Sequence, residues 1–166
     1  GGSKARVMPA VGAVVIVVPG AGGGAVCSAG QRCTSTRRLI IHDSIYDKVM
    51  KIIVDAYGLI QIGNPLVENN NVGPLIDKVA VNKYLNAIES AKKEGAKVLV
   101  EGGVLEGEGY ESGCYVKPAI LEVENQYETV QNETFAPILY VMKYSGDVTN
   151  AIELQNGVVQ GLSSAI

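Results

Sequence analysis

The feature that most restricts the fold of this chain is the alternation of short β-branched runs with segments of helical periodicity. Apolar runs predict strands at residues 13–18, 38–42, 97–103, 115–123 and 136–144, the third of them entering a glycine-rich turn. Two other segments repeat apolar residues at helical spacing, over 44–60 and 77–94. A short helix is expected over 148–154, and a last strand in the closing GLSSAI. This order favours an α/β fold with a sheet flanked by helices, and without a linker-like stretch we expect one domain.

Each of the two longer helices is predicted to have one apolar face and recognisable ends. Asp43 or Ser44 is placed to cap the start of the first helix. Its buried face is expected to contain Val49, Ile52, Ile53, Ala56, Tyr57 and Ile60. The second begins at Asp77 and is expected to end at Gly95. Its buried face is expected to contain Val81, Leu85, Ile88 and Ala91.

Composition excludes several classes of protein. Lys and Arg total 14 against 17 Asp and Glu, a net charge of −3 without a long basic block, so nucleic acid is not an expected partner. Hydrophobic residues make up 47% of the chain, enough for a buried core. The uncharged stretch 7–31 is broken by prolines and glycines. Its apolar core of about eight residues is shorter than the roughly 18 to 20 that a membrane-spanning helix needs, and we expect neither a membrane span nor a cleaved signal.

The cysteine and histidine content limits metal and disulfide chemistry. The chain has three cysteines, Cys27, Cys33 and Cys114, without a C-x-x-C pair, and one histidine, His42. Neither a disulfide framework nor a zinc site can be assembled from this set, so no metal is expected. Unpaired cysteines are typical of a reducing compartment, and we expect a cytoplasmic protein.

One interpretation of the segment 14–42 places its chemistry in the glycines. GAGGGA at 20–25 fits the G-x-G-x-x-A pattern of a dinucleotide-binding loop, with Gly20 and Gly22 at the phosphates. Asp43, about twenty residues on, stands where a ribose-binding carboxylate is found. Against this, Pro19 interrupts the exit from the strand, and the polar residues that follow form a poor helix.

A second interpretation places the chemistry in Cys33, which lies in the polar sequence GQRCTSTRR. Three nearby arginines would favour a nucleophilic thiolate if they face it. The alternative is that Cys33 is a small buried hydrophobic residue. His42 is expected to be a strand-end residue rather than a catalytic base, and Cys27 and Cys114 are expected to be packing residues.

The motifs taken together resemble the aldehyde dehydrogenase superfamily. SAGQRCTSTRRLIIHDSIYDKV is similar to its nucleophile segment, ETFAP to its E-x-F-x-P motif, and QGLSSAI to the segment after it. GQRCT, IGNP, GPL and ETFAPILYV are most similar to the antiquitin branch. The resemblance covers residues 25–166, with a weak match at the opening Gly-Gly.

The resemblance implies a role for four residues. Cys33 would be the catalytic nucleophile, forming first a thiohemiacetal and then a thioester. Arg32 would bind a carboxylate of the substrate, as a guanidinium can do with two hydrogen bonds. Glu133 would bind the hydroxyls of the nicotinamide ribose, and Phe135 would pack beside the nicotinamide. The implied cofactor is NAD, with NADP possible, and the implied substrate is an amino-acid semialdehyde such as α-aminoadipic semialdehyde.

The resemblance also implies that residues 1–166 are a fragment of the catalytic domain. The family's general-base glutamate would lie two positions before Gly1, in E-L-G-G, and the dinucleotide-binding domain would lie upstream. We therefore expect the isolated chain to be inactive and the full-length enzyme to be a homo-oligomer. Residues 6–24 lack the acidic cluster expected there. Two other hypotheses remain open: a non-catalytic α/β piece in which Cys33 is a bystander, and a dinucleotide binder that uses GAGGGA.

Overall fold

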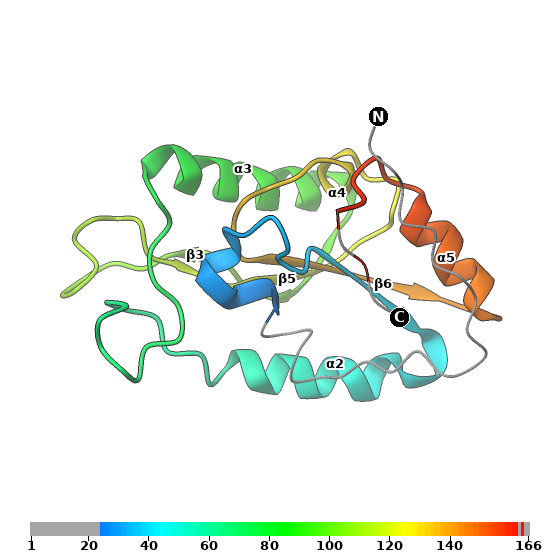
Figure 1. Cartoon of the computed structure of the whole chain (residues 1–166), viewed down its shortest axis with the longest axis horizontal. Coiled ribbons are helices and arrows are strands. Elements are labelled where there is room, and N and C mark those ends of the chain that lie inside the picture. Colours follow the sequence, from blue (N-terminus) through cyan, green and yellow to red (C-terminus); the bar gives the residue numbers. More distant parts are fainter. Residues whose placement is uncertain (1–23, 163, 165–166) are drawn as a thin grey trace.

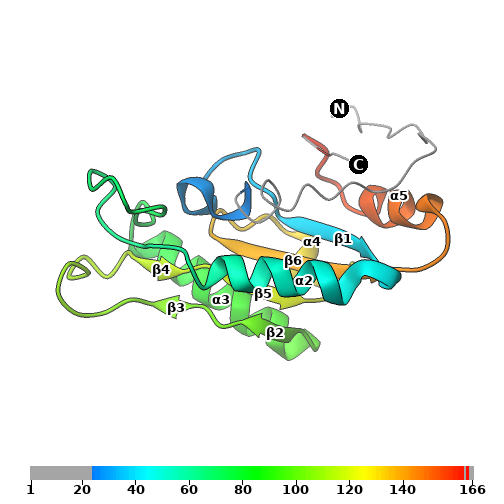
Figure 2. The same cartoon turned by 90° about the horizontal axis from the view of Figure 1, so that it is seen from below.

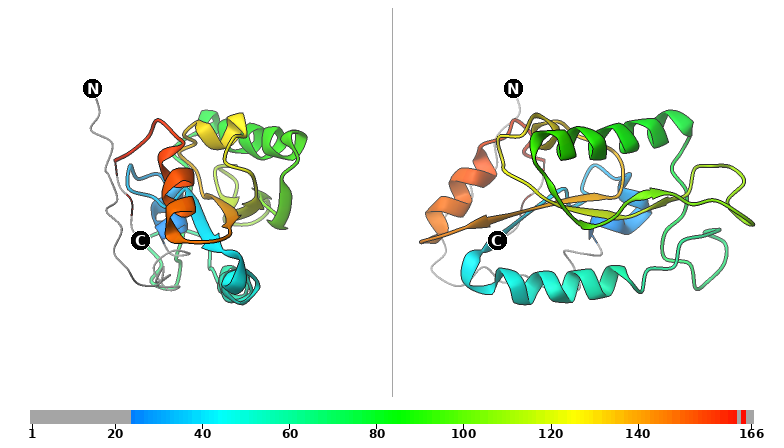
Figure 3. Two further views of the ribbon diagram at one scale, coloured as in Figure 1. Left: turned by 90° about the vertical axis from the view of Figure 1, so that its right-hand side faces the viewer. Right: turned by 180° about the vertical axis from the view of Figure 1, so that it is seen from behind.

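The computed structural model describes residues 24–162 and 164. Its centre is a four-stranded sheet in the order β1 (Arg38–His42), β6 (Ile138–Tyr144), β5 (Ala119–Glu122) and β2 (Lys97–Val100). The β1–β6 and β6–β5 pairs are parallel, whereas β2 is antiparallel to β5. The sheet lies between two long helices, α2 and α3 (Figures 1 and 3). The predicted α/β sheet flanked by helices is thereby confirmed, while the strand expected at 13–18 lies outside the described residues.

The remaining elements are short. A two-stranded ribbon of β3 (Gly103–Val104) and β4 (Val116–Lys117) lies at the end of the molecule away from α5 (Val148–Asn156) (Figure 2). The single strand expected over 115–123 is broken at Pro118, which has no N–H to donate to a ladder. The expected helix over 148–154 is present as α5. The expected strand in GLSSAI is wrong for residues 161, 162 and 164, which are not in a strand.

Helix α3 (Lys78–Glu94) forms as the sequence predicts. Asp77 accepts a hydrogen bond from the Ala80 N–H at 2.7 Å, and Gly95 ends the helix with a left-handed φ of 111°. Tyr84, rather than the half-buried Leu85, is fully buried on the inner face. The Tyr84 hydroxyl accepts from the Gly103 N–H at 2.8 Å and donates to the Lys117 carbonyl at 2.5 Å, which ties α3 to the β3–β4 ribbon. Within the described part of the chain, no helix is long and apolar enough to cross a membrane.

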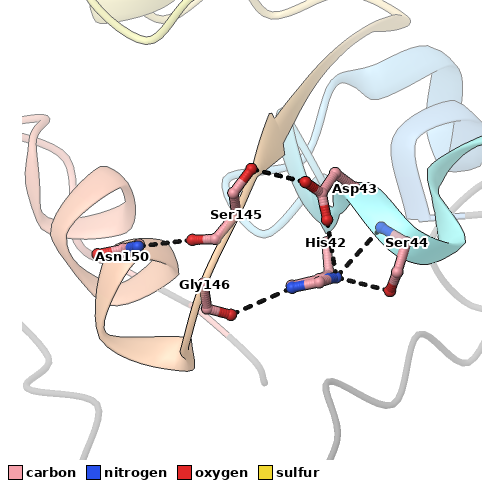
Figure 4. A network of polar contacts seen from close by, with 6 residues as sticks. All are labelled: His42, Asp43, Ser44, Ser145, Gly146 and Asn150. Atoms are coloured by element: carbon pink, nitrogen blue, oxygen red, sulfur yellow. Dashed lines mark hydrogen bonds and ion pairs between the residues drawn. The ribbon is translucent and has the colours of Figure 1, made fainter.

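The start of helix α2 (Asp43–Tyr57) is capped by His42, and the prediction of Asp43 or Ser44 as the cap was wrong. His42 Nδ1 accepts from the Ser44 N–H at 3.2 Å, while Nε2 lies 3.1 Å from the Gly146 carbonyl (Figure 4). Because a carbonyl can only accept, Nε2 carries the proton in this arrangement. Ser145 donates to Asp43 at 2.7 Å, and this bond lowers the pKa of Asp43. The ends of β1 and β6 are thus joined where α2 begins.

The buried face of α2 differs from the predicted face. Ile52 is 44% exposed and Ala56 is also exposed, so both predictions were wrong. The residues that do face the sheet are Tyr46, Val49, Met50, Ile53 and Tyr57. Apolar residues lie on more than one side of this helix, and spacing alone therefore did not determine which side is buried.

The segment before β1 packs against the start of β6 through Gly30. A Cβ on Gly30 would lie 2.3 Å from the Ala136 carbonyl oxygen and 2.8 Å from the Pro137 nitrogen. Gly30 also has a left-handed φ of 68°, after Ser28 and Ala29 at 53° each. Only glycine can adopt this backbone without strain and allow so close an approach. Gly30 therefore fixes where the residues that follow it lie relative to β6.

We expect Gly30→Ala to lower the free energy of unfolding by at least about 2 kcal/mol, because steric overlap and left-handed strain add. The matched control is Gly73→Ala, whose Cβ would meet only Pro65 atoms at 3.6 Å or more, and which should change stability by less than about 0.5 kcal/mol. Urea unfolding followed by circular dichroism measures both. Equal effects of the two substitutions would show that the Gly30 contact is not a constraint.

Candidate active site around Cys33

Cys33 lies in a tight turn that directly follows Gly30. The Ser35 N–H donates to the Arg32 carbonyl at 3.1 Å, and the Arg32 N–H donates to the hydroxyl of the buried Ser35 at 3.1 Å. These two bonds close the turn and leave Cys33 and Thr34 exposed between them. The interpretation of Cys33 as a buried hydrophobic residue is therefore wrong. Its thiol is open to a reactant.

Gln31 fastens the turn to the loop that leads into α3. Its side-chain amide donates to the Pro74 carbonyl at 3.2 Å and accepts from the Ile76 N–H at 2.9 Å. The sequence analysis assigned no role to Gln31, although Gln31 belongs to the G-Q-x-C motif and its partner Pro74 belongs to the GPL motif. The two residues before Arg32 and Cys33 thus make separate contacts, Gly30 with the start of β6 and Gln31 with residues 74–76.

The three arginines near Cys33 bond other groups in the structure. Arg38 points away, bonding the Asn125 side chain at 3.0 Å and the Leu154 carbonyl at 3.2 Å, with Gln155 as a further partner. Arg32 donates through Nε to the Ser28 hydroxyl at 2.9 Å. Arg38 is therefore structural, and only the other two arginines belong to the neighbourhood of the turn.

Arg37 connects the cysteine turn to Glu133 and Phe135. Nη1 donates to the Gly30 carbonyl at 3.0 Å and Nη2 to the Arg32 carbonyl at 3.1 Å. Nε lies 3.8 Å from a Glu133 carboxylate oxygen, and Cζ stands 4.9 Å from the centroid of the Phe135 ring. Burial lowers the pKa of Arg37, and the Glu133 carboxylate opposes this shift. Arg37 thus links the backbone of the turn that holds Cys33 to two other predicted site residues, Glu133 and Phe135.

An open cavity of about 860 Å³ adjoins this cluster, between α3 and the Asn132–Phe135 segment. Its volume is within the usual range for ligand sites. Glu133 and Phe135 line one side, both exposed, with the Phe135 ring 44% accessible. The opposite side is a polar stripe of α3 that sequence reasoning missed: Lys83, Asn86, Ser90 and Lys93. These four residues recur at helical spacing on the side of α3 opposite the predicted apolar face. That pattern is visible in the sequence and could have identified them.

The other cysteines and the histidine lie outside the cluster. His42 is occupied by Ser44 and Gly146, which agrees with its predicted role as a strand-end residue and gives it no contact with Cys33. Cys114 is half-buried against the core, as predicted, but Cys27 is exposed and the prediction that it packs inside was wrong. Among residues 24–162, no group of His, Cys, Asp or Glu is arranged to hold a metal ion.

The dinucleotide-loop hypothesis meets the structure only in part. Gly20 and Gly22 lie outside the described residues. Asp43 lies in the first turn of α2, where the Ser145 hydroxyl donates to its carboxylate. Its carboxylate therefore has a structural partner in the described fold, and the loop itself stays a prediction.

Sequence and structure comparisons agree on the relatives of this chain. The model of the aldehyde dehydrogenase family matches residues 1–166. Aldehyde dehydrogenase family 7 member A1 of Pisum sativum is 46% identical over 142 residues, 86% of this chain and 27% of the relative. The α-aminoadipic semialdehyde dehydrogenase of Bos taurus is 45% identical over 152 residues, 91% of this chain and 27% of the relative.

Solved structures show the same likeness. The crystal structure of betaine aldehyde dehydrogenase from Staphylococcus aureus in complex with NAD+ superposes with a TM-score of 0.81 at 28% identity, covering 86% of this chain and 28% of that one. HpcC from Thermus thermophilus gives a TM-score of 0.79 at 29% identity, over 85% of this chain and 28% of that one. The chain spans about a quarter of the length of these relatives. By sequence and by fold, it belongs to the aldehyde dehydrogenase family.

Proposed function

We propose that this chain supplies the nucleophile and part of the cofactor site of an enzyme that oxidises an aldehyde to a carboxylic acid with NAD or NADP. The observation that carries the proposal is the exposed thiol of Cys33 in a turn tied through Arg37 to Glu133 and Phe135. The chain spans 27% of the Pisum sativum relative, and within this proposal residues 1–166 are a part of the catalytic domain. A homo-oligomeric assembly stays a prediction.

The residues near Cys33 suit the cofactor as well as the nucleophile. When bound, NAD would supply the hydride acceptor. The exposed Glu133 carboxylate can accept hydrogen bonds from ribose hydroxyls, and the exposed Phe135 ring can pack against a planar heterocycle. The adjoining cavity carries charges of both signs, from Lys83 and Lys93 on one side and from Glu94, Glu128 and Glu133 on the other, so its lining is polar without favouring one sign of ligand.

The proposed reaction first forms and later breaks a C–S bond at Cys33. The Cys33 thiolate attacks the aldehyde carbon, forming a C–S bond and an oxyanion to which the Cys33 N–H can donate. Loss of hydride from that carbon leaves a thioester on Cys33. Water then attacks the thioester carbon, the C–S bond breaks, and the carboxylic acid and the thiolate are released. The base for this last step is not among the four residues to which the motifs assign a role.

We propose that Arg32 selects an acidic aldehyde. Ser28 holds its Nε at 2.9 Å, so the side chain is anchored next to Cys33 while its two terminal nitrogens have no hydrogen bond to a described residue. A guanidinium in this state can bind a carboxylate with two parallel bonds. The α-aminoadipic semialdehyde named for the bovine relative carries such a carboxylate, and a semialdehyde of this kind is the favoured substrate.

The test uses a hybrid enzyme, in which the aligned residues of this chain replace the matching segment of the Pisum sativum relative. We expect Cys33→Ala to abolish aldehyde-dependent NADH formation, because no other thiol lies in the turn. The matched control is Cys27→Ala, an exposed cysteine six positions earlier, which should retain activity within about twofold. Normal turnover by the Cys33 variant would refute the proposed function.

Substrate selection by Arg32 is tested by Arg32→Met in the same hybrid enzyme. A lost charge-assisted pair is worth about 1.5 to 3 kcal/mol, so KM for an acidic semialdehyde should rise roughly 10- to 100-fold. Steady-state kinetics with propanal, which has no carboxylate, should change by less than about threefold. A similar rise in KM for both aldehydes would contradict the role of Arg32 in recognising the carboxylate.

A further inference from the structure

Arg37 lies immediately before β1, and its side chain bridges two segments a hundred residues apart. Its forked end reaches the carbonyls of Gly30 and Arg32 on one side, and its Nε and ring-facing carbon reach Glu133 and Phe135 on the other. The side chain is only 18% exposed, compared with 46% for that of Glu133. Arg37 thus adds a polar link between these two segments to the close backbone contact of Gly30 with Ala136.

The bond from Arg37 to the Arg32 carbonyl acts on Cys33 directly. That carbonyl and the Cys33 N–H belong to the same planar peptide group, in which C=O and N–H point in opposite directions. Fixing the carbonyl at 3.1 Å from Nη2 therefore fixes the direction of the Cys33 N–H. In the proposed function, this N–H is the donor that faces the oxyanion.

Arg37 and Glu133 form an ion pair but no hydrogen bond. Arg37 Nε is buried without a hydrogen-bond acceptor, and the nearest carboxylate oxygen of Glu133 is 3.8 Å away. A buried unpaired donor is costly, so the guanidinium attracts the carboxylate and limits where Glu133 can lie. A lysine at this position cannot reproduce the interaction, because a single ammonium has neither the planar fork nor a face to stack on Phe135.

We propose that Arg37 is a positioning residue, which orients the Arg32–Cys33 peptide and holds Glu133 and Phe135 beside it. The inference rests on the proposed function and adds to it. Arg37 touches neither substrate nor cofactor. It sets the geometry between the oxyanion donor and the side chains assigned to the nicotinamide ribose.

The test compares Arg37→Gln and Arg37→Lys with Arg38→Lys in the hybrid enzyme. Arg38 is the matched control, since it is also half-buried and bonds carbonyls, but at α5. Three rates are measured: alkylation of Cys33 by iodoacetamide, hydrolysis of p-nitrophenyl acetate, and NADH formation. Alkylation needs an accessible thiol and no oxyanion donor, whereas ester hydrolysis needs both.

For both Arg37 variants we expect Cys33 alkylation within about threefold of the parent, ester hydrolysis at least about tenfold slower, and KM for NAD raised at least about fivefold. Arg37→Lys keeps the positive charge. If ester hydrolysis is as slow in this variant as in Arg37→Gln, the planar guanidinium, and not the charge alone, is required. Arg38→Lys should lower the thermal midpoint and leave the ratio of the three rates unchanged.

Two outcomes overturn the inference while the proposed function stands. In one, the Arg37 variants retain ester hydrolysis and KM for NAD. In the other, all three rates change together in the Arg37 and Arg38 variants, as general loosening of the fold would cause. If instead the parent hybrid forms no NADH that depends on Cys33, the proposed function fails, and the inference fails with it.

Discussion

The close contact between Gly30 and Ala136 is the constraint on which the candidate site depends. It joins a segment before the first described strand to a segment more than a hundred residues later, at a distance that excludes any side chain on Gly30. The cysteine turn begins directly after Gly30, and the E-x-F-x-P motif contains Ala136. Because β6 follows Pro137 directly, both motifs are attached to a buried inner strand of the sheet.

Polar contacts then set the details of the site. Gln31 binds the loop before α3, and Arg37 binds two carbonyls of the cysteine segment while facing Glu133. Bonds to carbonyl groups direct the backbone of the turn, and the thiol of Cys33 is left exposed. A nucleophile needs this combination, since its surroundings must be fixed while the reacting atom stays accessible.

The elements predicted most accurately are those whose signals are local. The strand at Arg38–His42 has the short apolar run Leu39–Ile41 at its centre, and α3 has an aspartate at its start and a glycine at its end. The cap of α2 was not predicted, because the ring of His42 is held by the Gly146 carbonyl at its second nitrogen. Gly146 is distant in sequence and comes near His42 only in the folded chain. The buried side of α2 was partly missed for a similar reason: the sheet, not the spacing, selects among several apolar sides.

The candidate site shows the same division. Cys33, Glu133 and Phe135 could be named from motifs because each stands in a short pattern that resembles one family. The partners of the arginines could not be named, since Arg38 finds its acceptors 87 and 116 residues away. A glycine is required at position 30 because of a steric contact with Ala136, and the sequence around Gly30 gives no sign of that distant contact. The polar stripe of α3 lacked any pattern other than its position opposite the apolar face.

The central claim, that Cys33 carries the substrate while Glu133 and Phe135 face the cofactor, has a direct test. The hybrid enzyme is mixed with an acidic semialdehyde and NAD, quenched in acid within a turnover, and mapped by peptide mass spectrometry. We predict the mass of the acyl group on the Cys33 peptide alone, appearing with the first NADH and disappearing as the acid is released. NADH formation without an acyl group on Cys33, or with one on Cys27 or Cys114 instead, would contradict the claim.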